Sequence, residues 1–171
     1  MEILWSIGAV VMAVIMSWRD LRTREVVDRE LAWFCFFTLM PRALEPWVNL
    51  GGVMAAESPV SPLPYWLLQT IRLAPALGGA VFLLALELPV RRLTGETMIG
   101  TGDVLFSVAA GFMLAPGGSV RMVCLAFLLA FPFSFFLFAV CRPRRPLPFI
   151  PFLALSAFLV RFVPFLSTWL F

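Results

Sequence analysis

Six continuously apolar runs, separated by short segments rich in arginine, glycine and proline, constrain the fold of this chain more than any other feature. Of its 171 residues, 61% are hydrophobic and 13% are charged, whereas a soluble domain is nearer half apolar and a quarter charged. So much apolar surface does not fit inside one soluble core of this size. Runs without alternating polarity favour helices over a membrane barrel. We therefore predict an all-α, polytopic membrane bundle.

The predicted bundle is a single domain, residues 1–171, with about six transmembrane helices. The spans are expected at residues 3–19, 28–47, 65–88, 99–115, 120–140 and 147–170. The second is long enough only if its helix begins near Asp28, a plausible N-cap, and continues past Pro41. Residues 45–64 contain Gly51-Gly52 and several prolines, so an irregular segment on the membrane surface is expected there.

Arginine placement predicts an orientation. All 13 basic residues are arginine, and they lie at the ends of apolar runs rather than in one polar patch, so nucleic-acid binding is not indicated. Most of them fall in segments 19–30, 91–97 and 142–146, which alternating spans place on one side. Because positive residues mark the cytoplasmic side, we expect a multi-pass cell-membrane protein with these segments in the cytoplasm and both termini outside.

The residue types that the chain lacks narrow its chemistry. It has no histidine, which removes the usual zinc ligand and the usual neutral-pH base. Cys35, Cys124 and Cys141 are scattered without Cys-x-x-Cys spacing, so no metal site, cofactor or disulfide framework is predicted. A serine nucleophile would have no base to activate it. Carboxylates remain as the groups for acid–base catalysis.

Two aspartates are the candidates. Asp103 follows two glycines at the start of the fourth run, and Asp20 ends the first run. A carboxylate at the edge of a bilayer core is costly and is a functional candidate by default. Each also has an ordinary explanation, Asp103 as a helix-start residue and Asp20 as a solvated charge neutralised by neighbouring arginines. The glycines would let another segment, such as a substrate backbone, approach Asp103.

The predicted topology puts both aspartates on the cytoplasmic side. Two carboxyl groups brought close share a proton and titrate as a pair. The ionised member takes a proton from water, and the protonated member donates to the scissile carbonyl and later to the leaving nitrogen. Glu87 and Arg91, four residues apart, are expected to form a structural ion pair instead.

Three short motifs occur in order along the chain. They are Asp20 followed by Val26-Val27-Asp28, then Gly100-Thr101-Gly102-Asp103, then Pro-Phe-Ile-Pro-Phe-Leu at residues 148–153. In this order the chain resembles the type IV prepilin peptidases, including the archaeal preflagellin peptidases. The motifs of that family read Asp…Ile-Pro-Asn, Gly-x-Gly-Asp and Pro-Phe-Gly-Pro-Phe-Leu. This chain departs from them at residues 26–28 and at Ile150, and it has Leu105 where a lysine is frequent.

The resemblance implies a membrane aspartic endopeptidase with Asp20 and Asp103 as the catalytic pair and Gly100 and Gly102 as motif support. Its substrates would be precursor pilins or archaellins, whose short basic leaders are cut at the cytoplasmic face. The chain lacks the Cys-x-x-Cys insertion of many bacterial members that also N-methylate, so we expect cleavage alone. Glu25 and Glu96 would attract the basic leader, or instead pair with local arginines.

Other classes stay open at this stage. A small proton-coupled transporter or channel subunit also uses buried carboxylates, with Arg161 as a natural counter-ion. A presenilin-type intramembrane protease shares the Gly-x-Gly-Asp motif, but expects its first aspartate within a span after tyrosine, whereas Trp18 and Arg19 precede Asp20. A non-catalytic assembly partner of a pilus system is the third alternative.

Overall fold

The computed structural model describes residues 2–23, 26–53, 74–95, 97, 99–115, 117–141 and 148–163. Over these residues the regular structure is helical: α1 (Glu2–Thr23), α2 (Asp28–Val53), the 3-10 turn η1 (Ala74–Leu77), α4 (Gly78–Thr94), α5 (Thr101–Met113), α6 (Gly118–Cys141) and α7 (Ile150–Phe162). Three helical stretches, Leu4–Thr23, Ala74–Thr94 and Gly118–Phe136, are long and apolar enough to cross a membrane. The prediction of an all-helical membrane protein is confirmed at this level.

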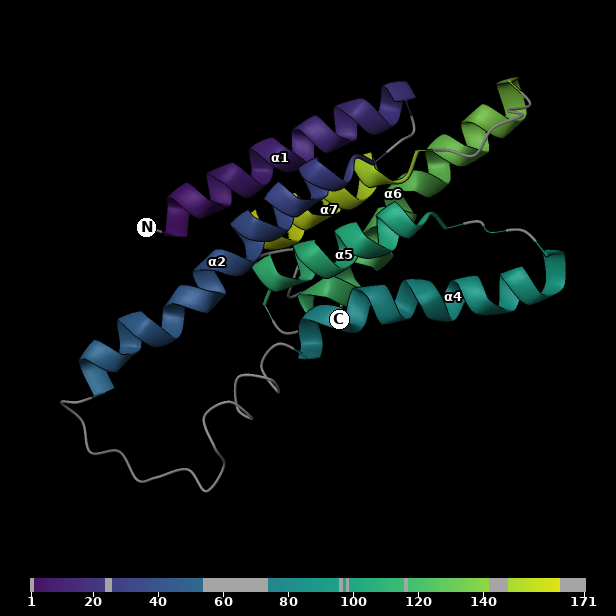
Figure 1. Cartoon of the computed structure of the whole chain (residues 1–171). Helices are drawn as coiled ribbons and strands as arrows, with labels where there is room; N and C mark the ends of the chain where they lie inside the picture. Colours follow the sequence, from purple (N-terminus) through teal and green to yellow (C-terminus); the bar gives the residue numbers. More distant parts are fainter. Residues whose placement is uncertain are drawn as a thin grey trace.

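Helix α5 is the central element of the bundle. It packs against α2, α4, α6 and α7, while α1 covers α2 and α7. Figure 1 shows that α1, α4 and α6 end at the same end of the bundle at which α5 and α7 begin. The chain therefore returns to this end repeatedly, and residues near the end of α1 and the start of α5 become spatial neighbours.

Aromatic stacking and small residues hold α5 at the centre. The rings of Phe34 on α2 and Phe106 on α5 stack with their centroids 4.7 Å apart, and both side chains are fully buried. On the other side, a Cβ on Gly111 would lie 2.1 Å from the carbonyl oxygen of Ala76. Only glycine lets η1 cross α5 this closely, as is common where membrane helices pack.

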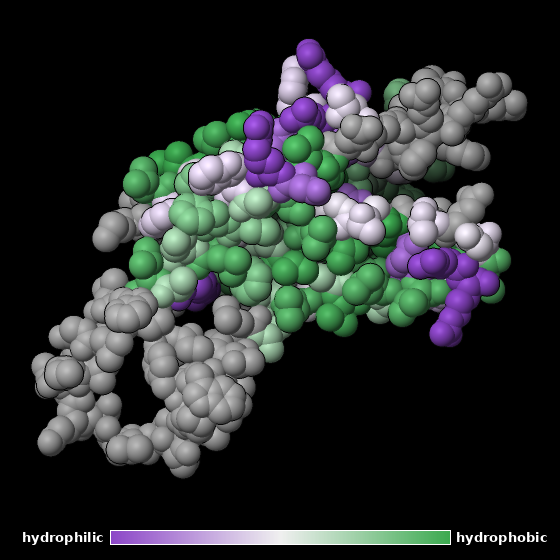
Figure 2. Space-filling view, viewed as in Figure 1, coloured by the Kyte–Doolittle hydropathy of each residue, from purple (hydrophilic) through white to green (hydrophobic). Residues whose placement is uncertain are grey.

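The outer surface is apolar along the middle of the bundle. Large side chains are open there, with Leu4 72% exposed on α1 and Phe131 71% exposed on α6. Figure 2 shows hydrophobic residues over the visible middle of the molecule, with hydrophilic residues gathered toward the end where α1 and α4 finish. A soluble monomer rarely exposes contiguous apolar surface on this scale, whereas acyl chains would cover it.

The second helix differs from the sequence prediction at both ends. As expected, α2 continues through Pro41, but it then runs to Val53, so the prediction of an irregular segment is wrong for residues 45–53. A proline removes only one helical hydrogen bond, and a helix still satisfies the remaining backbone in lipid. At the start, the Val27 carbonyl accepts the N–H of Leu31, so Asp28 lies inside the first turn rather than capping it. Residues 54–64 lie outside the described part.

The fourth helix is shifted along the sequence relative to the predicted span 65–88. It begins at Gly78 and extends to Thr94, so much of the predicted 91–97 loop is helical, while residues 65–73 lie outside the described part. Gly95 ends the helix with φ 74°, and its N–H bonds the Arg91 carbonyl at 2.9 Å. This left-handed glycine cap is a common helix stop.

Candidate active site

Asp20 continues the buried stripe of α1. Ala9 and Met16, at helical spacing before it, are 1% and 2% exposed, and Asp20 itself is 7% exposed. Residues 9, 13, 16 and 20 share one helix face. The face that packs into the bundle therefore carries a carboxylate in its last turn. Asp20 is helical and buried, so the expected alternative of a solvated loop charge is wrong.

Two arginines near Asp20, Arg19 and Arg22, contact other side chains. The Arg19 guanidinium forms an ion pair with the carboxylate of Glu30, a buried side chain in the first turn of α2. The Arg22 guanidinium lies over the Trp18 ring, 4.9 Å from its centroid, at cation–π distance. The ion pair ties the end of α1 to the start of α2 and fixes the orientation of the turn that carries Asp20.

Asp103 lies in the first turn of α5 and is half-buried. One of its carboxylate oxygens, Oδ2, accepts the backbone N–H of Gly100 at 3.2 Å. This is the half of a capping box that a carboxylate at N3 provides. Asp103 therefore does have the helix-capping role given by its ordinary explanation. The same hydrogen bond holds its carboxyl group at the N-terminus of α5.

The two aspartates are close enough to influence each other. The charge of Asp20 acts directly on the Asp103 carboxyl group. Such an interaction falls with distance and is weakened by water, so it indicates neighbouring groups in a partly buried region. Figure 1 shows why, since the end of α1 and the start of α5 lie at the same end of the bundle. The helix ends that carry Asp20 and Asp103 thus lie at one end of the bundle, and the action of the two residues as a catalytic pair stays a prediction.

The predicted glycines have distinct surroundings. Gly100 has extended backbone just before α5, and a Cβ there would meet only the Asp103 side chain and the Gly102 nitrogen. A Cβ on Gly102 would come 2.6 Å from Cγ2 of Val26. The segment that approaches Gly102 is thus the chain's own connection between α1 and α2, rather than the expected substrate backbone.

Glu87 holds the segment before Asp103. Its Oε2 atom, on α4, accepts the backbone N–H of Ile99 at 3.0 Å. The expected partner was Arg91, and the structure instead shows Glu87 fixing the residue directly before Gly100. Spacing within one helix favoured Arg91. The contact to Ile99 depends on how the chain turns between α4 and α5, for which the sequence holds no comparable signal.

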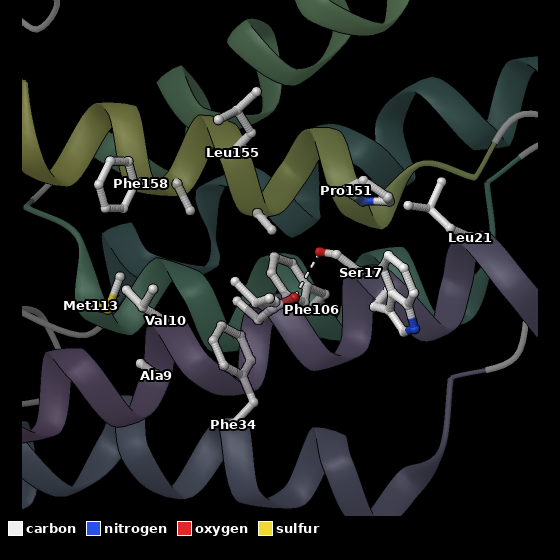
Figure 3. A pocket seen from close by; sticks show the side chains of 15 residues that line it. Ala9, Val10, Ser17, Leu21, Phe34, Phe106, Met113, Pro151, Leu155 and Phe158 are labelled. Atoms are coloured by element: carbon white, nitrogen blue, oxygen red, sulfur yellow. Dashed lines mark hydrogen bonds between the residues drawn. The ribbon is translucent and has the colours of Figure 1, made fainter.

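An apolar groove of about 430 Å³ lies between α1 and α7. Phe106 forms part of its inner wall, and Leu21 and Pro151 line it toward the end that carries Asp20 (Figure 3). Its one polar side chain among the described lining residues, Ser17, donates to the Ala13 carbonyl of its own helix at 2.7 Å. The groove is therefore suited to apolar groups and ends within a turn of Asp20.

The two acidic residues predicted to attract a basic leader, Glu25 and Glu96, lie outside the described part of the chain. Their role stays a prediction. Glu87, at the same end of the bundle, is an acid that the sequence analysis did not assign to the site.

Comparison of the chain with protein-family models, with curated proteins and with solved structures finds no match. The geometry around Asp20 and Asp103 is therefore the basis for assigning a function.

Proposed function

We propose that this protein is a membrane aspartic endopeptidase in which Asp20 and Asp103 together activate a water molecule. The observation that carries the proposal is that a buried aspartate at the end of α1 and a half-buried aspartate at the start of α5 lie at the same end of the bundle, near enough for their charges to interact. Perturbed carboxyl groups brought together are typical of catalytic sites. The chain has no histidine, so a carboxyl pair is the acid–base machinery available to it at this end of the bundle.

Mutual repulsion gives the pair its division of labour. Two adjacent carboxyl groups ionise in separate steps, so one proton is retained over an intermediate pH range. The ionised carboxylate accepts a proton from the water molecule while the water oxygen attacks the scissile carbonyl carbon. The protonated group donates to the carbonyl oxygen, and the amide nitrogen leaves with a proton from the pair. Glu87 and Glu30 position the two helix ends without entering the reaction.

The proposed substrate has a short basic leader followed by an apolar segment, as in precursor pilins or archaellins. The groove between α1 and α7 is apolar and ends beside the turn of Asp20, which suits the residues that follow the cut. Glu25 and Glu96 would add negative charge on the leader side. We place this end of the bundle in the cytoplasm, and expect cleavage without N-methylation.

The test is co-expression of the full chain with candidate precursor pilins and archaellins, followed by mass spectrometry of the product's N-terminus. The expected product lacks its leader, is cut just before its hydrophobic helix and is unmethylated. Asp28→Asn, an exposed acid near the same site, is the matched control for Asp103→Asn and should cleave normally. Precursors that stay intact, or are cut equally by the Asp103→Asn variant, would overturn the proposal.

A further inference from the structure

A second pocket lies at the end of the bundle opposite the two aspartates. It has a volume of about 220 Å³ and is lined by side chains from α1, α2, α5 and α7. Its polar members are Ser6, Thr38, Arg42 and Arg161, and Trp5 and Phe37 stand beside them. Unlike the apolar groove near Asp20, this pocket brings two guanidinium groups from separate helices to one space.

Arg42 is held at the wall of this pocket by the end of α5. Its Nε donates to the carbonyl of Phe112 at 3.3 Å, and one terminal nitrogen donates to the carbonyl of Leu114 at 3.4 Å. These carbonyls are among those that a helix leaves without internal partners at its C-terminus. The contacts stabilise α5 and keep the guanidinium in a defined position across the pocket from α7.

Arginines from two helices bring positive charge to the pocket. Arg161 enters it from the last turn of α7, and Arg42 lines it from α2. Of the lining side chains that the structure describes, none is acidic. Guanidinium groups that line one small space favour an anion between them.

We propose that this pocket binds a phosphate-bearing anion, either the headgroup of an anionic phospholipid or a free phosphate. Guanidinium nitrogens donate charge-assisted hydrogen bonds to phosphate oxygens, and Ser6 also lines the pocket. Basic pockets between transmembrane helices bind lipid headgroups. Trp5, packed against Phe36 and Phe37 with centroids 5.8 and 6.1 Å apart, belongs to a residue type enriched at headgroup depth. The site does not depend on the peptidase proposal.

The test uses the purified full chain in neutral detergent, with ligand binding followed by native mass spectrometry and by thermal unfolding. Phosphatidylglycerol is compared with phosphatidylcholine, whose choline should be repelled by the two arginines. Inorganic phosphate is compared with chloride at equal ionic strength. The wild-type chain should be stabilised by phosphatidylglycerol, by inorganic phosphate, or by both. A response to phosphatidylglycerol alone assigns a lipid, and a response to inorganic phosphate alone assigns a soluble ion.

Arg161→Gln is the informative variant, since Arg42→Gln also removes contacts to α5. It should weaken binding of the responding ligand about tenfold, the loss expected for a charged hydrogen-bonding pair, while Arg161→Lys should retain part of the binding. Arg92→Gln, an exposed arginine at the other end of the bundle, should bind as the wild type. The proposal is overturned by no response to either ligand, by Arg161→Gln binding within about twofold of wild type, or by an equal loss in Arg92→Gln.

Discussion

Val26 lies against Gly102 so closely that a Cβ on the glycine would come within 2.6 Å of Cγ2 and 3.2 Å of Cβ of the valine. This contact joins the connection that follows Asp20 to the first turn of α5, which carries Asp103. This van der Waals contact thus helps to hold the two halves of the candidate site together.

Gly102→Ala should therefore separate the two halves of the site. The added methyl group meets a β-branched side chain that cannot rotate away easily, and overpacking of this kind typically costs about 1–3 kcal/mol. We expect a lower unfolding temperature and at least a tenfold loss of precursor cleavage. Thr101→Ala, a change at the exposed residue between the two glycines, is the control and should cleave as the wild type.

A compensating change makes the same test specific. Val26→Ala removes the two methyl groups nearest to Gly102, so the Gly102→Ala/Val26→Ala double variant should recover part of the lost cleavage. The interaction energy between mutations at two contacting residues is about 0.5–3 kcal/mol. Strictly additive losses in the two variants would show that the contact does not set the geometry of the site.

Glu87→Ala should slow cleavage by loosening the segment before Asp103. It removes the acceptor that holds the Ile99 N–H, and a hydrogen bond to a charged group contributes about 1.5–3 kcal/mol. We expect kcat to fall about tenfold with little change in KM. The variant displaces Asp103 but leaves the substrate groove between α1 and α7 in place. Glu87→Gln keeps a carbonyl acceptor and should lose less. Equal losses in the two variants would mean that the charge of Glu87, rather than its hold on Ile99, is what matters.

The proposed orientation predicts which ends of the bundle face the cytoplasm. Thr97 and Ala115 are both exposed and lie before and after α5. In a chain whose native cysteines are replaced, Thr97→Cys should react with a membrane-impermeant maleimide only after the cells are opened. Ala115→Cys should react in intact cells. The reverse pattern would place Asp20 and Asp103 outside the cell.

The peptidase should show a bell-shaped dependence of kcat/KM on pH. Two carboxyl groups placed close together lose their protons in separate steps, so the proposed pair passes through a singly protonated form. Activity falls on the acid side when both groups are protonated and on the alkaline side when both are ionised. An activity that rises with pH to a plateau, measured on a purified precursor, would point to a single general base.

The helical architecture was predictable because the apolar runs are long and the breaks between them are sharp. The start of α5 at the Gly-x-Gly-Asp motif falls near the expected boundary. Helix α2 was misjudged over residues 45–53, since prolines and glycines that end a helix in water are tolerated beside lipid. Local composition does not show whether such a segment lies in water or beside lipid.

The sequence allowed the two carboxyl groups of the candidate site to be chosen, but not the contacts that hold their helix ends in place. Charges within apolar sequence are rare, so Asp20 and Asp103 stood out from the sequence alone. The contacts of Val26 with Gly102 and of Glu87 with Ile99 join segments through tertiary packing, which sequence spacing cannot predict. The alternative explanation of Asp20 relied on neighbouring arginines, and the structure shows one of them, Arg19, paired with Glu30 on the next helix.

The measurement that tests the central claim most directly is cleavage of one purified precursor by Asp20→Asn, Asp103→Asn and the double variant, with folding checked by thermal unfolding. Groups that act as a unit are not additive, so each single variant should lose about as much activity as the double variant, at least a thousandfold by the usual cost of removing an acid–base partner. A single variant that retains near-normal turnover, or losses that simply add, would contradict a shared role for the two aspartates.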